Sequence, residues 1–432
     1  MIDMLKELPV EKRKDFDEVT QGPSADEVVS YATSSLATCK DGCKASCPLG
    51  VDIHSVLDHV KRKEFQHARD LLETANPLPS ITSRFCGAHC SGTCSCAKHF
   101  HAVERFLGDH YKPTQQKVKA GKQKVAVIGA GVAGLTVASL LRKQGLNVKL
   151  IEAMEKAGGS LSRSTPEFRL PSKIAQQEVA GITSCIELQT HAIGGAMHPL
   201  DELAHKFDAV VIATGANKPA FLGIAGENLP NVYTATDYLQ MAKKKSKEKT
   251  LVIGGSDPAM DAARTAKRLG DEVTVLFHKD LDYMPASALN IKHALQEGVK
   301  FMLLTKPTRI SGIGKASQVE CMQMMLAESD LDDTKVAVPM ENSEFSIDCD
   351  KVIVAVGLEP NPTIGRYTPL RTVGKGRLWT NEYQQTNVPN VFAAGEIALG
   401  STSVEKTIAQ AKKCAVNVVA YLNGEIKEEE EM

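Results

Sequence analysis

Hydrophobic residues in the first quarter of the chain recur at helical spacing and predict a small helical region. Four of them fall at positions i, i+3, i+4 and i+7: Ile53, Val56, Leu57 and Val60. Such a repeat places one apolar stripe along a helix. A second helix is expected over residues 65–74, and it should end before Pro77 because proline cannot continue a helix.

Beyond residue 119 the pattern changes to short apolar runs that alternate with amphipathic helices. One strand–helix–strand unit covers residues 124–129, 132–143 and 147–152, and a second covers residues 250–255, 257–269 and 272–277. Each unit is typical of a nucleotide-binding domain built on a parallel sheet. We therefore predict an α/β chain in which two Rossmann-like domains follow the helical region.

Residues 125–141 form a stretch of seventeen residues without a charge. The stretch is slightly short for a membrane span, and its three glycines have the spacing of a strand-to-helix turn. We interpret it as a buried strand followed by a helix, and we expect no membrane insertion. Residues 1–10 lack an apolar core, so we predict no secretory signal and expect a cytoplasmic protein.

The charges of the chain are nearly balanced. The formal net charge is −1, and 24% of the residues are charged. A nucleic-acid-binding protein is expected to carry a strongly basic face, and this composition gives no support for one. We therefore expect no nucleic-acid partner, and candidate chemistry has to be sought in local motifs.

The first glycine turn has the spacing G-x-G-x-x-G between a predicted strand and a predicted helix. Gly129 permits the tight turn, Gly131 lets the backbone approach a pyrophosphate, and Gly134 allows close packing of the helix on the sheet. Glu152 ends the next strand, where a carboxylate can accept hydrogen bonds from ribose hydroxyls. The motif together with its strand, helix and terminal acid predicts a dinucleotide site.

The cysteines are concentrated near the N-terminus. Seven of the eleven lie within 58 residues: Cys39, Cys43, Cys47, Cys86, Cys90, Cys94 and Cys96. Without a secretory signal, such a group is better explained as metal ligands than as disulfides. Soft thiolates at short spacing suit iron–sulfur clusters, while four cysteines also suit Zn²⁺, so a zinc site or a single cluster stays an alternative.

Several segments resemble the flavoprotein reductases with two dinucleotide domains, in which the NAD(P) domain interrupts the FAD domain. The segments are residues 158–161, 166–171, 208–215, 351–357 and 390–396. The resemblance implies that FAD occupies the first site, with Gly159, Leu161, Arg169, Gly395 and Glu396 beside it. The helix after Ser403 and Val404 would point its N-terminus at the flavin ring and stabilise reduced flavin. The family usually has Asp at the position of Glu396.

Over residues 39–425 the chain more closely resembles the small (β) subunit of bacterial glutamate synthase and the N-terminal part of dihydropyrimidine dehydrogenase. The matching segments are residues 43–48, 76–79, 84–86, 104–106, 260–266 and 284–286, with Cys90 and Cys94. The family holds two [4Fe–4S] clusters in its helical domain. It usually starts with C-x-x-C-x4-C-x3-C-P, whereas this chain has only C-x3-C-x3-C-P.

The resemblance also implies how the cluster ligands are grouped. It assigns Cys47, Cys86, Cys90 and Glu104 to one cluster, with Glu104 at the family's non-cysteine position. The remaining thiols, which we assign to the second cluster, are Cys39, Cys43, Cys94 and Cys96. Glu104 as an ordinary surface carboxylate remains an open alternative.

The second glycine turn departs from the family's glycine triplet followed by Asn. Gly254 and Gly255 are kept, but Ser256 adds a Cβ where the pyrophosphate approaches, and Asp257 adds a negative charge at the helix N-terminus. Family members that use NADPH have paired arginines after the next strand, where this chain has His278 and Lys279. Ala259 completes the predicted site, and the choice between NADP and NAD stays open.

The resemblance implies four segments along the chain: a [4Fe–4S] domain over residues 1–118, an FAD domain over 119–222 and 351–432, and an NAD(P) domain over 223–350. The expected function is electron transfer between NAD(P)H, FAD, two clusters and a redox partner subunit or ferredoxin. No acid–base residue is required, so none is predicted as catalytic.

The alternative is a non-catalytic electron-transfer subunit that no longer uses NAD(P)H. A disulfide reductase is disfavoured because residues 158–160 and 254–261 contain no cysteine.

Overall fold

The computed structural model describes residues 4–39, 47–87, 90, 95–114, 118–119, 121–241, 244–328, 335–361, 364 and 368–426. The N-terminal region is helical, as predicted. Its helices are α1 (Ala25–Thr38), α2 (Ile53–Lys61), α3 (Phe65–Ala75), α4 (Pro79–Phe85) and α5 (Phe100–His110), with the short 3-10 turn η4 (Ser95–Ala97). The four residues of the predicted stripe are all buried on α2. Asp52 begins that helix by accepting a hydrogen bond from the Ser55 amide.

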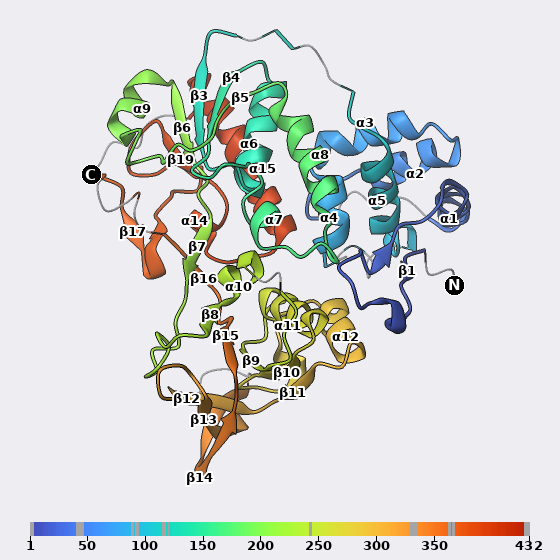
Figure 1. Ribbon diagram of the computed structural model, residues 1–432. Helices are drawn as coiled ribbons and strands as arrows, with labels where there is room; N and C mark the ends of the chain where they lie inside the picture. The colour runs from blue at the N-terminus through green and yellow to red at the C-terminus, as the bar shows by residue number, and fades with distance from the viewer. Residues whose placement is uncertain are drawn as a thin grey trace.

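The first parallel sheet has the strand order β19-β6-β3-β4-β5. Its strands are β3 (Lys124–Ile128), β4 (Asn147–Ile151), β5 (Glu187–Gln189), β6 (Ala209–Ile212) and β19 (Val391–Ala393). The helices of this domain are α6 (Val132–Lys143), α7 (Ser160–Arg163), α8 (Ser172–Thr183), α9 (Leu200–Lys206), α14 (Glu396–Leu399) and α15 (Val404–Leu422). Helices α6 and α15 pack together on one face of the sheet, between it and the N-terminal helices (Figure 1). The uncharged stretch forms β3 and α6, which confirms the strand–helix interpretation.

The second parallel sheet has the order β11-β10-β9-β15-β8. Its strands are β8 (Val232–Thr234), β9 (Lys249–Ile253), β10 (Glu272–Leu276), β11 (Lys300–Met302) and β15 (Lys351–Val354). Its helices are α10 (Ala235–Met241), α11 (Asp257–Leu269) and α12 (Ala288–Gln296), with the 3-10 turn η5 (Leu281–Tyr283). A three-stranded antiparallel sheet, β12 (Thr305–Ser311), β13 (Gln318–Glu328) and β14 (Lys335–Asp348), follows β11 and shares a core with the parallel sheet.

The chain crosses between the two sheets along a short antiparallel pair, β7 (Ala216–Pro219) and β16 (Leu358–Pro360). Strand β15 pairs with β9 and β8, so the second sheet reaches past residue 350, where the boundary was expected. After β16 come β17 (Thr372–Val373), the 3-10 turn η6 (Gly374–Gly376) and β18 (Arg377–Leu378), before β19 rejoins the first sheet. The first domain is therefore discontinuous, as expected.

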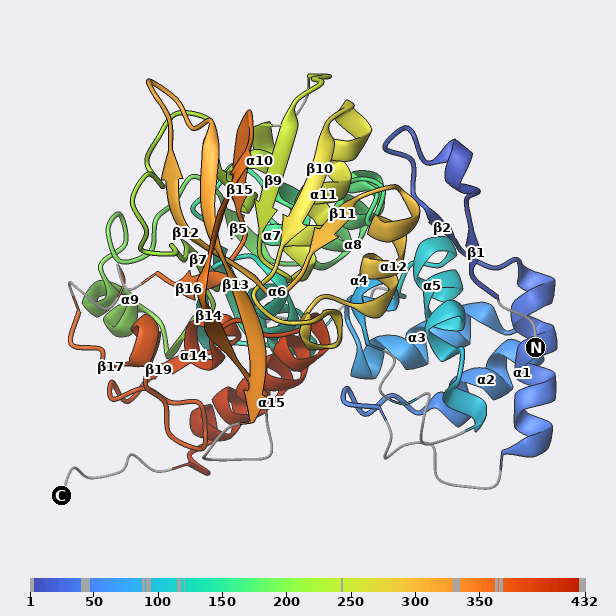
Figure 2. The same cartoon turned by 90° about the horizontal axis from the view of Figure 1, so that it is seen from below.

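The first residues of the chain form an arm, residues 4–21, that reaches the second parallel-sheet domain. The arm contains β1 (Lys6–Glu7), η1 (Val10–Lys12) and β2 (Thr20–Gln21), and Figure 2 shows it beside α12. The Arg13 guanidinium donates to the Gln296 side chain at 2.8 Å, and the Lys292 ammonium lies 2.8 Å from the Glu7 carboxylate. The arm thus joins the helical region to α12.

Among the described residues, none of the helices combines the length and the apolar character that crossing a bilayer requires.

Candidate cofactor sites

The first glycine turn joins β3 to α6. At Gly129 φ is +101°, and a Cβ there would lie 2.4 Å from the Ala213 carbonyl oxygen. A Cβ on Gly134 would lie 1.8 Å from the Gly129 carbonyl oxygen, so α6 packs directly against the turn. At Gly131, by contrast, the only described atom within 4 Å of an added Cβ, apart from those of the adjoining residues, is the Gly159 Cα, at 3.9 Å. The space before the N-terminus of α6 is therefore open, as the backbone approach of a pyrophosphate requires.

Glu152 lies directly after β4 and faces this turn. Its carboxylate accepts hydrogen bonds from the backbone amides of Ala130 at 2.8 Å and Met154 at 2.9 Å. These bonds fix the carboxylate beside the glycine turn, where the sequence placed it. Its contact with a ribose stays a prediction.

The C-terminal part of the first domain meets the same turn. Gly395 begins α14 with a φ of +78°, and a Cβ on it would lie 2.6 Å from the Ala133 Cβ of α6. The Glu396 carboxylate accepts from the Thr402 amide at 3.0 Å, and burial raises its pKa. The buried Thr214 hydroxyl, next to the Gly129 turn, has no hydrogen-bond partner among the described residues. Segments distant in sequence thus converge around the N-terminus of α6 and form a site that fits a dinucleotide. We call this site the cradle; the residues around it are Gly129, Gly131, Glu152, Thr214, Gly395 and Glu396.

Three further residues expected near FAD have different surroundings. Leu161 is buried in α7, and Val404 is the first residue of α15. Ser403 precedes α15, and its side chain makes no capping hydrogen bond to the helix; its hydroxyl donates to the Glu405 carboxylate at 2.7 Å. The N-terminus of α15 lies next to the cradle through the Thr402–Glu396 bond. Contact of these residues with FAD remains a prediction.

Arg169 joins three regions of the molecule. Its guanidinium lies 2.7 Å from the Asp261 carboxylate and 3.7 Å from that of Asp257, both on α11, and 4.6 Å from the centre of the Phe85 ring. The two carboxylates raise the pKa of Arg169 despite its burial. Arg169 therefore connects the first domain to α11 and to the end of α4, a role that the sequence did not predict.

The second glycine turn joins β9 to α11. At Gly254 φ is +136°, and a Cβ would lie 2.3 Å from the Ala355 carbonyl oxygen, while a Cβ on Gly255 would lie 2.7 Å from the Phe277 ring. Ser256 begins α11 and donates to the Ala355 carbonyl at 3.4 Å. Ala259 is fully buried. Packing alone therefore requires both glycines, and the serine hydroxyl is directed toward β15.

Asp257 is engaged with α12. Its carboxylate accepts from the Ser287 hydroxyl at 3.0 Å and from the Asn290 amide group at 2.9 Å. Together with Arg169, these donors surround the charge that we expected to repel a phosphate. The sequence did not predict this link between the two helices, because Ser287 and Asn290 lie about thirty residues away.

His278 and Lys279 follow β10, as expected. The Lys279 ammonium donates to the Lys335 carbonyl oxygen at 3.1 Å and lies 5.1 Å from the centre of the Tyr283 ring. Burial, with Lys279 and Lys306 nearby, lowers the pKa of His278. The positive charge at the end of this strand is present, and its contact with a 2′-phosphate stays a prediction.

Four of the predicted cluster ligands surround one small cavity of about 20 Å³: Cys47, Cys86, Cys90 and Glu104. Glu104 is 6% exposed and accepts hydrogen bonds from the Asn76 amide group at 2.6 Å and the Thr82 hydroxyl at 3.0 Å. Burial raises its pKa to about 7. The alternative of an exposed surface carboxylate is therefore wrong. Among the described residues, no three His, Cys, Asp or Glu side chains are arranged to hold a single metal ion.

The predicted ligand set in this cavity, three thiols and the Glu104 carboxylate, fits a [4Fe–4S] cluster by its chemistry. Of the four cysteines predicted to hold the second cluster, Cys43 and Cys94 lie outside the described residues. Cys39 and Cys96 are hydrogen-bonded to each other, and Cys96 also donates to the Ser35 carbonyl at 3.4 Å. The structure thus brings Cys39 and Cys96 together, and neither of them lines the cavity of the first group.

One further residue of the cavity wall was not predicted from the sequence. Glu405, in the first turn of α15, lines the cavity with the three cysteines although it lies 315 residues beyond Cys90. A carboxylate at this helix position has the appearance of an ordinary first-turn acid in the sequence.

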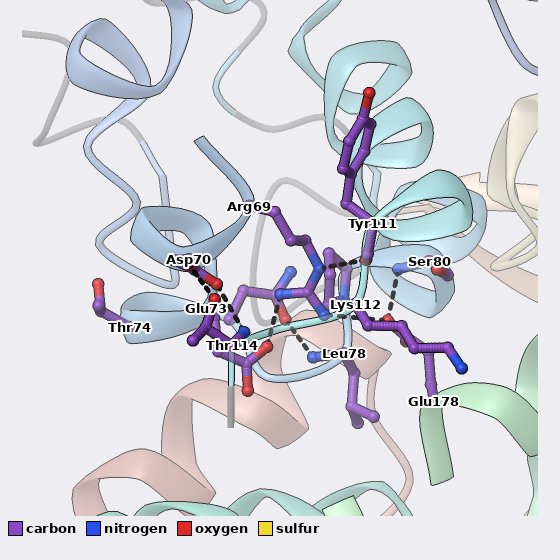
Figure 3. Close-up of polar contacts among 12 residues, drawn as sticks. Arg69, Asp70, Glu73, Thr74, Leu78, Ser80, Tyr111, Lys112, Thr114 and Glu178 are labelled. Carbon is purple, nitrogen blue, oxygen red and sulfur yellow. Dashed lines mark hydrogen bonds and ion pairs between the residues drawn. The ribbon is translucent and has the colours of Figure 1, made fainter. Parts of the chain in front are cut away.

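A larger cavity of about 810 Å³ separates α3 and α5 from α6 and α8. Figure 3 shows polar contacts on its wall, with Arg69, Glu73 and Glu178 among the labelled residues. The Arg69 guanidinium lies 2.6 Å from Glu73 and 3.8 Å from Glu178, whose carboxylate accepts from the Ser80 amide at 3.1 Å. Burial raises the pKa of Glu178 to about 8. These side chains connect the helical region to the first domain.

Comparison with known proteins identifies each part of the chain. Residues 176–415 match the model of the pyridine nucleotide-disulphide oxidoreductases, and residues 127–174 match an NAD(P)-binding Rossmann-like domain. Residues 12–116 match the 4Fe-4S cluster domain described as dihydropyrimidine dehydrogenase domain II. These matches agree with the three regions of the fold.

Three relatives illustrate the range of similarity. The small chain of NADPH glutamate synthase from Halomonas elongata is 29% identical, over 95% of this chain and 94% of the relative. The putative oxidoreductase AegA of Escherichia coli is 30% identical, over 96% of this chain and 69% of the relative. The β subunit of the NADP(+)-dependent formate dehydrogenase of Moorella thermoacetica is 30% identical over 88% of this chain, which spans only 60% of that relative.

Among solved structures, Mycobacterium tuberculosis FprA in complex with NADPH has a TM-score of 0.60 and 19% identity, covering 71% of this chain and 87% of FprA. Thioredoxin reductase from Lactococcus lactis has a TM-score of 0.54 and covers 70% of this chain. At such identities the likeness concerns the fold alone. The family match and these relatives nevertheless show that the chain belongs to the pyridine nucleotide-disulphide oxidoreductases, as an FAD-dependent NAD(P)H oxidoreductase of the glutamate synthase small-subunit type with an N-terminal iron–sulfur domain.

Proposed function

We propose that this chain transfers electrons between NAD(P)H, one FAD and two [4Fe–4S] clusters, and exchanges them with a partner subunit or a ferredoxin. When bound, flavin couples hydride transfer with one-electron transfer, which is the step that clusters continue. The relatives named above as small or β subunits support a partner subunit for this chain. A cytoplasmic location and the cofactor boundaries along the chain belong to the same proposal.

One observation carries the proposal. The residues at the start of α15 touch two predicted sites at once: the Thr402 amide donates to Glu396 at the dinucleotide cradle, and Glu405 lines the cavity with Cys47, Cys86 and Cys90. A single short segment therefore lies between the predicted flavin and the predicted cluster. Electron transfer between two centres requires such proximity.

The residues around the cradle have separate tasks in this proposal. Gly131 and the first turn of α6 would hold the pyrophosphate, since the open space and the amide donors lie there. Glu152 would orient the ribose, and the N-terminus of α15 would stabilise negative charge on the ring. At the second site, α11 would present its N-terminus to the nicotinamide dinucleotide, with Lys279 near the end of β10.

The test is the cofactor content and flavin reduction of the full chain after anaerobic purification. We expect about eight iron atoms and one FAD per chain, because two four-iron clusters require that iron. Rapid mixing with NADPH or NADH should bleach the flavin absorbance. Stoichiometric zinc with little iron would contradict the cluster assignment, and about four iron atoms would contradict the second cluster.

A second candidate function is a non-catalytic electron-transfer subunit that holds FAD and clusters without using NAD(P)H. Ser256 and Asp257 favour it, because both depart from the glycine-rich turn that accepts a pyrophosphate. The same mixing experiment separates the two functions. A flavin that dithionite reduces but neither nicotinamide reduces would support the non-catalytic subunit.

A further inference from the structure

The cavity between Cys47, Cys86 and Cys90 has two carboxylates in its wall rather than one. Glu104 comes from α5 in the helical region, and Glu405 comes from α15 in the first domain. Glu405 is 2% exposed, although carboxylates are seldom buried without a purpose. One cluster needs four ligands, and three cysteines with Glu104 already supply them. Glu405 is therefore an additional acidic group at the predicted cluster site.

The position of Glu405 is fixed by contacts on both sides. The Ser403 hydroxyl donates to its carboxylate at 2.7 Å, which holds the side chain at the start of the helix. Two turns further along α15, the Lys412 ammonium donates to the carbonyl oxygens of Leu49 at 2.5 Å and Ala75 at 2.7 Å. These carbonyls flank Cys47 and Asn76, and Asn76 donates to Glu104. Helix α15 is thus docked on the two segments that form the cavity.

We propose that Glu405 is a positioning residue that lowers the reduction potential of the cluster held by Cys47, Cys86, Cys90 and Glu104. The inference rests on the proposed function, because it assumes that a cluster binds there. A buried negative charge opposes the arrival of an electron beside it, since Coulomb interactions are weakly screened in the protein interior. Charge close to a cluster is one of the main determinants of its potential.

The consequence for electron flow is specific. The α15 carboxylate would set the driving force of the step between the flavin and the nearer cluster, and it would do so from the domain that holds the flavin. Glu405 would act most strongly on this cluster, because it lines the cavity of Cys47, Cys86 and Cys90 directly.

The test is a redox titration of the full protein carrying FAD and clusters, with the cluster signals followed by electron paramagnetic resonance. In Glu405→Gln we expect the one-electron equilibrium of one cluster to shift at least tenfold toward the reduced form, which corresponds to about 59 mV. The potentials of the second cluster and of the flavin should move by clearly less. Glu405→Asp keeps the charge, so its cluster potential should stay close to that of the unaltered protein. Lys406→Gln changes a charge on the exposed side of the same turn and should leave all potentials unchanged.

Iron and flavin content are measured before each titration, so that a failure of the proposed function can be distinguished from a failure of the Glu405 inference. If the unaltered protein carries flavin but no iron, the proposed function and this inference both fall. If Glu405→Gln retains all its iron and its potentials do not move, only the inference is overturned. Loss of about half of the iron from Glu405→Gln would make Glu405 a ligand and would also overturn the role proposed here. A potential shift confined to the flavin would mean that Glu405 acts on the flavin site rather than on the cluster, and it would overturn the inference.

Discussion

Gly131 and Gly134 belong to the same turn but differ in what an added side chain would meet. Gly134 faces a backbone oxygen of its own turn, whereas Gly131 faces open space. A larger residue at Gly131 is therefore compatible with the folded chain and incompatible with a pyrophosphate. A substitution at Gly131 should therefore cause loss of the cofactor, whereas one at Gly134 should disturb the fold itself.

For Gly131→Val we expect a folded protein that has lost its FAD. The valine side chain would fill the space through which the backbone approaches the pyrophosphate. Flavin absorbance per chain measures the loss, and circular dichroism checks the fold. Gly181→Ala on α8 is a matched control, because an added Cβ there meets no described atom within 4 Å. Stoichiometric FAD in Gly131→Val would show that the site lies elsewhere.

Single residues were predictable where the chemistry is local. The roles of Gly129 and Gly134 follow from a motif of six residues, and the structure confirms the steric reason for each. Glu405 and the partners of Asp257 could not be predicted, because both depend on which distant helix packs beside the site. The grouping of Cys47, Cys86 and Cys90 came from the family resemblance, since spacing alone does not decide it.

At the scale of elements, the N-terminus of α11 carries two departures from the family's glycine turn, Ser256 and Asp257. Ser256 begins the helix with a φ of −87°, so glycine is not required there for backbone conformation. The Asp257 carboxylate is held by α12 and by Arg169. Replacing Asp257 would therefore disturb the packing of two helices, and Ser256 is the better position for testing the dinucleotide site.

For Ser256→Gly we expect tighter binding of NADPH by on the order of 1 kcal/mol, because the Cβ that crowds the pyrophosphate is removed. The dissociation constant from a binding titration measures the change. Ser256→Ala keeps the Cβ and removes only the hydroxyl that donates to Ala355, so it should bind NADPH as weakly as the unaltered protein. Equal gains in both variants would assign the effect to the hydroxyl instead.

Elements with a strong local pattern were predicted, and elements that depend on long-range pairing were not. Helices α2 and α3 and the two strand–helix–strand units lie where the periodicity placed them. The antiparallel strands β12–β14 were missed, because their partners are each other and their faces are only half buried. Strand β15 was expected in the FAD domain but belongs to the second parallel sheet. The sequence could not decide this, since an apolar strand fits either parallel sheet equally well.

At the scale of the whole molecule, the junction between the helical region and the first domain contains buried charges. Glu178 on α8 faces Arg69 on α3 and the backbone amides at the start of α4. Burial raises the pKa of Glu178 from 4.5 to about 8. The folded protein thus keeps this proton between about pH 4.5 and pH 8, while the unfolded chain releases it.

Because the folded state binds the additional proton, Glu178 favours folding most below pH 4.5, and that contribution is lost as the pH rises through 8. Glu178→Gln is neutral in both states and should remove this slope, gaining on the order of 3 kcal/mol relative to the unaltered protein at pH 8. Urea unfolding at pH 5 and pH 8 measures the difference. Glu155→Gln, at an exposed position, should retain the slope. Parallel pH profiles for Glu178→Gln and the unaltered protein would contradict the assignment.

The N-terminal arm has a consequence for the order in which the protein assembles during translation. Arg13 and Gln296 are 283 residues apart, so the arm leaves the ribosome long before its partner. At typical rates of synthesis this interval is roughly 15–60 s. During that time the helical region and the first half of the flavin domain can fold, but the contacts of the arm with α12 cannot yet form. The earliest residues of the chain therefore complete one of the latest contacts. An N-terminal truncation would disturb both α12 and the helical region, since Met4 is buried in the core of that region and Glu18 pairs with Arg84 and Arg105.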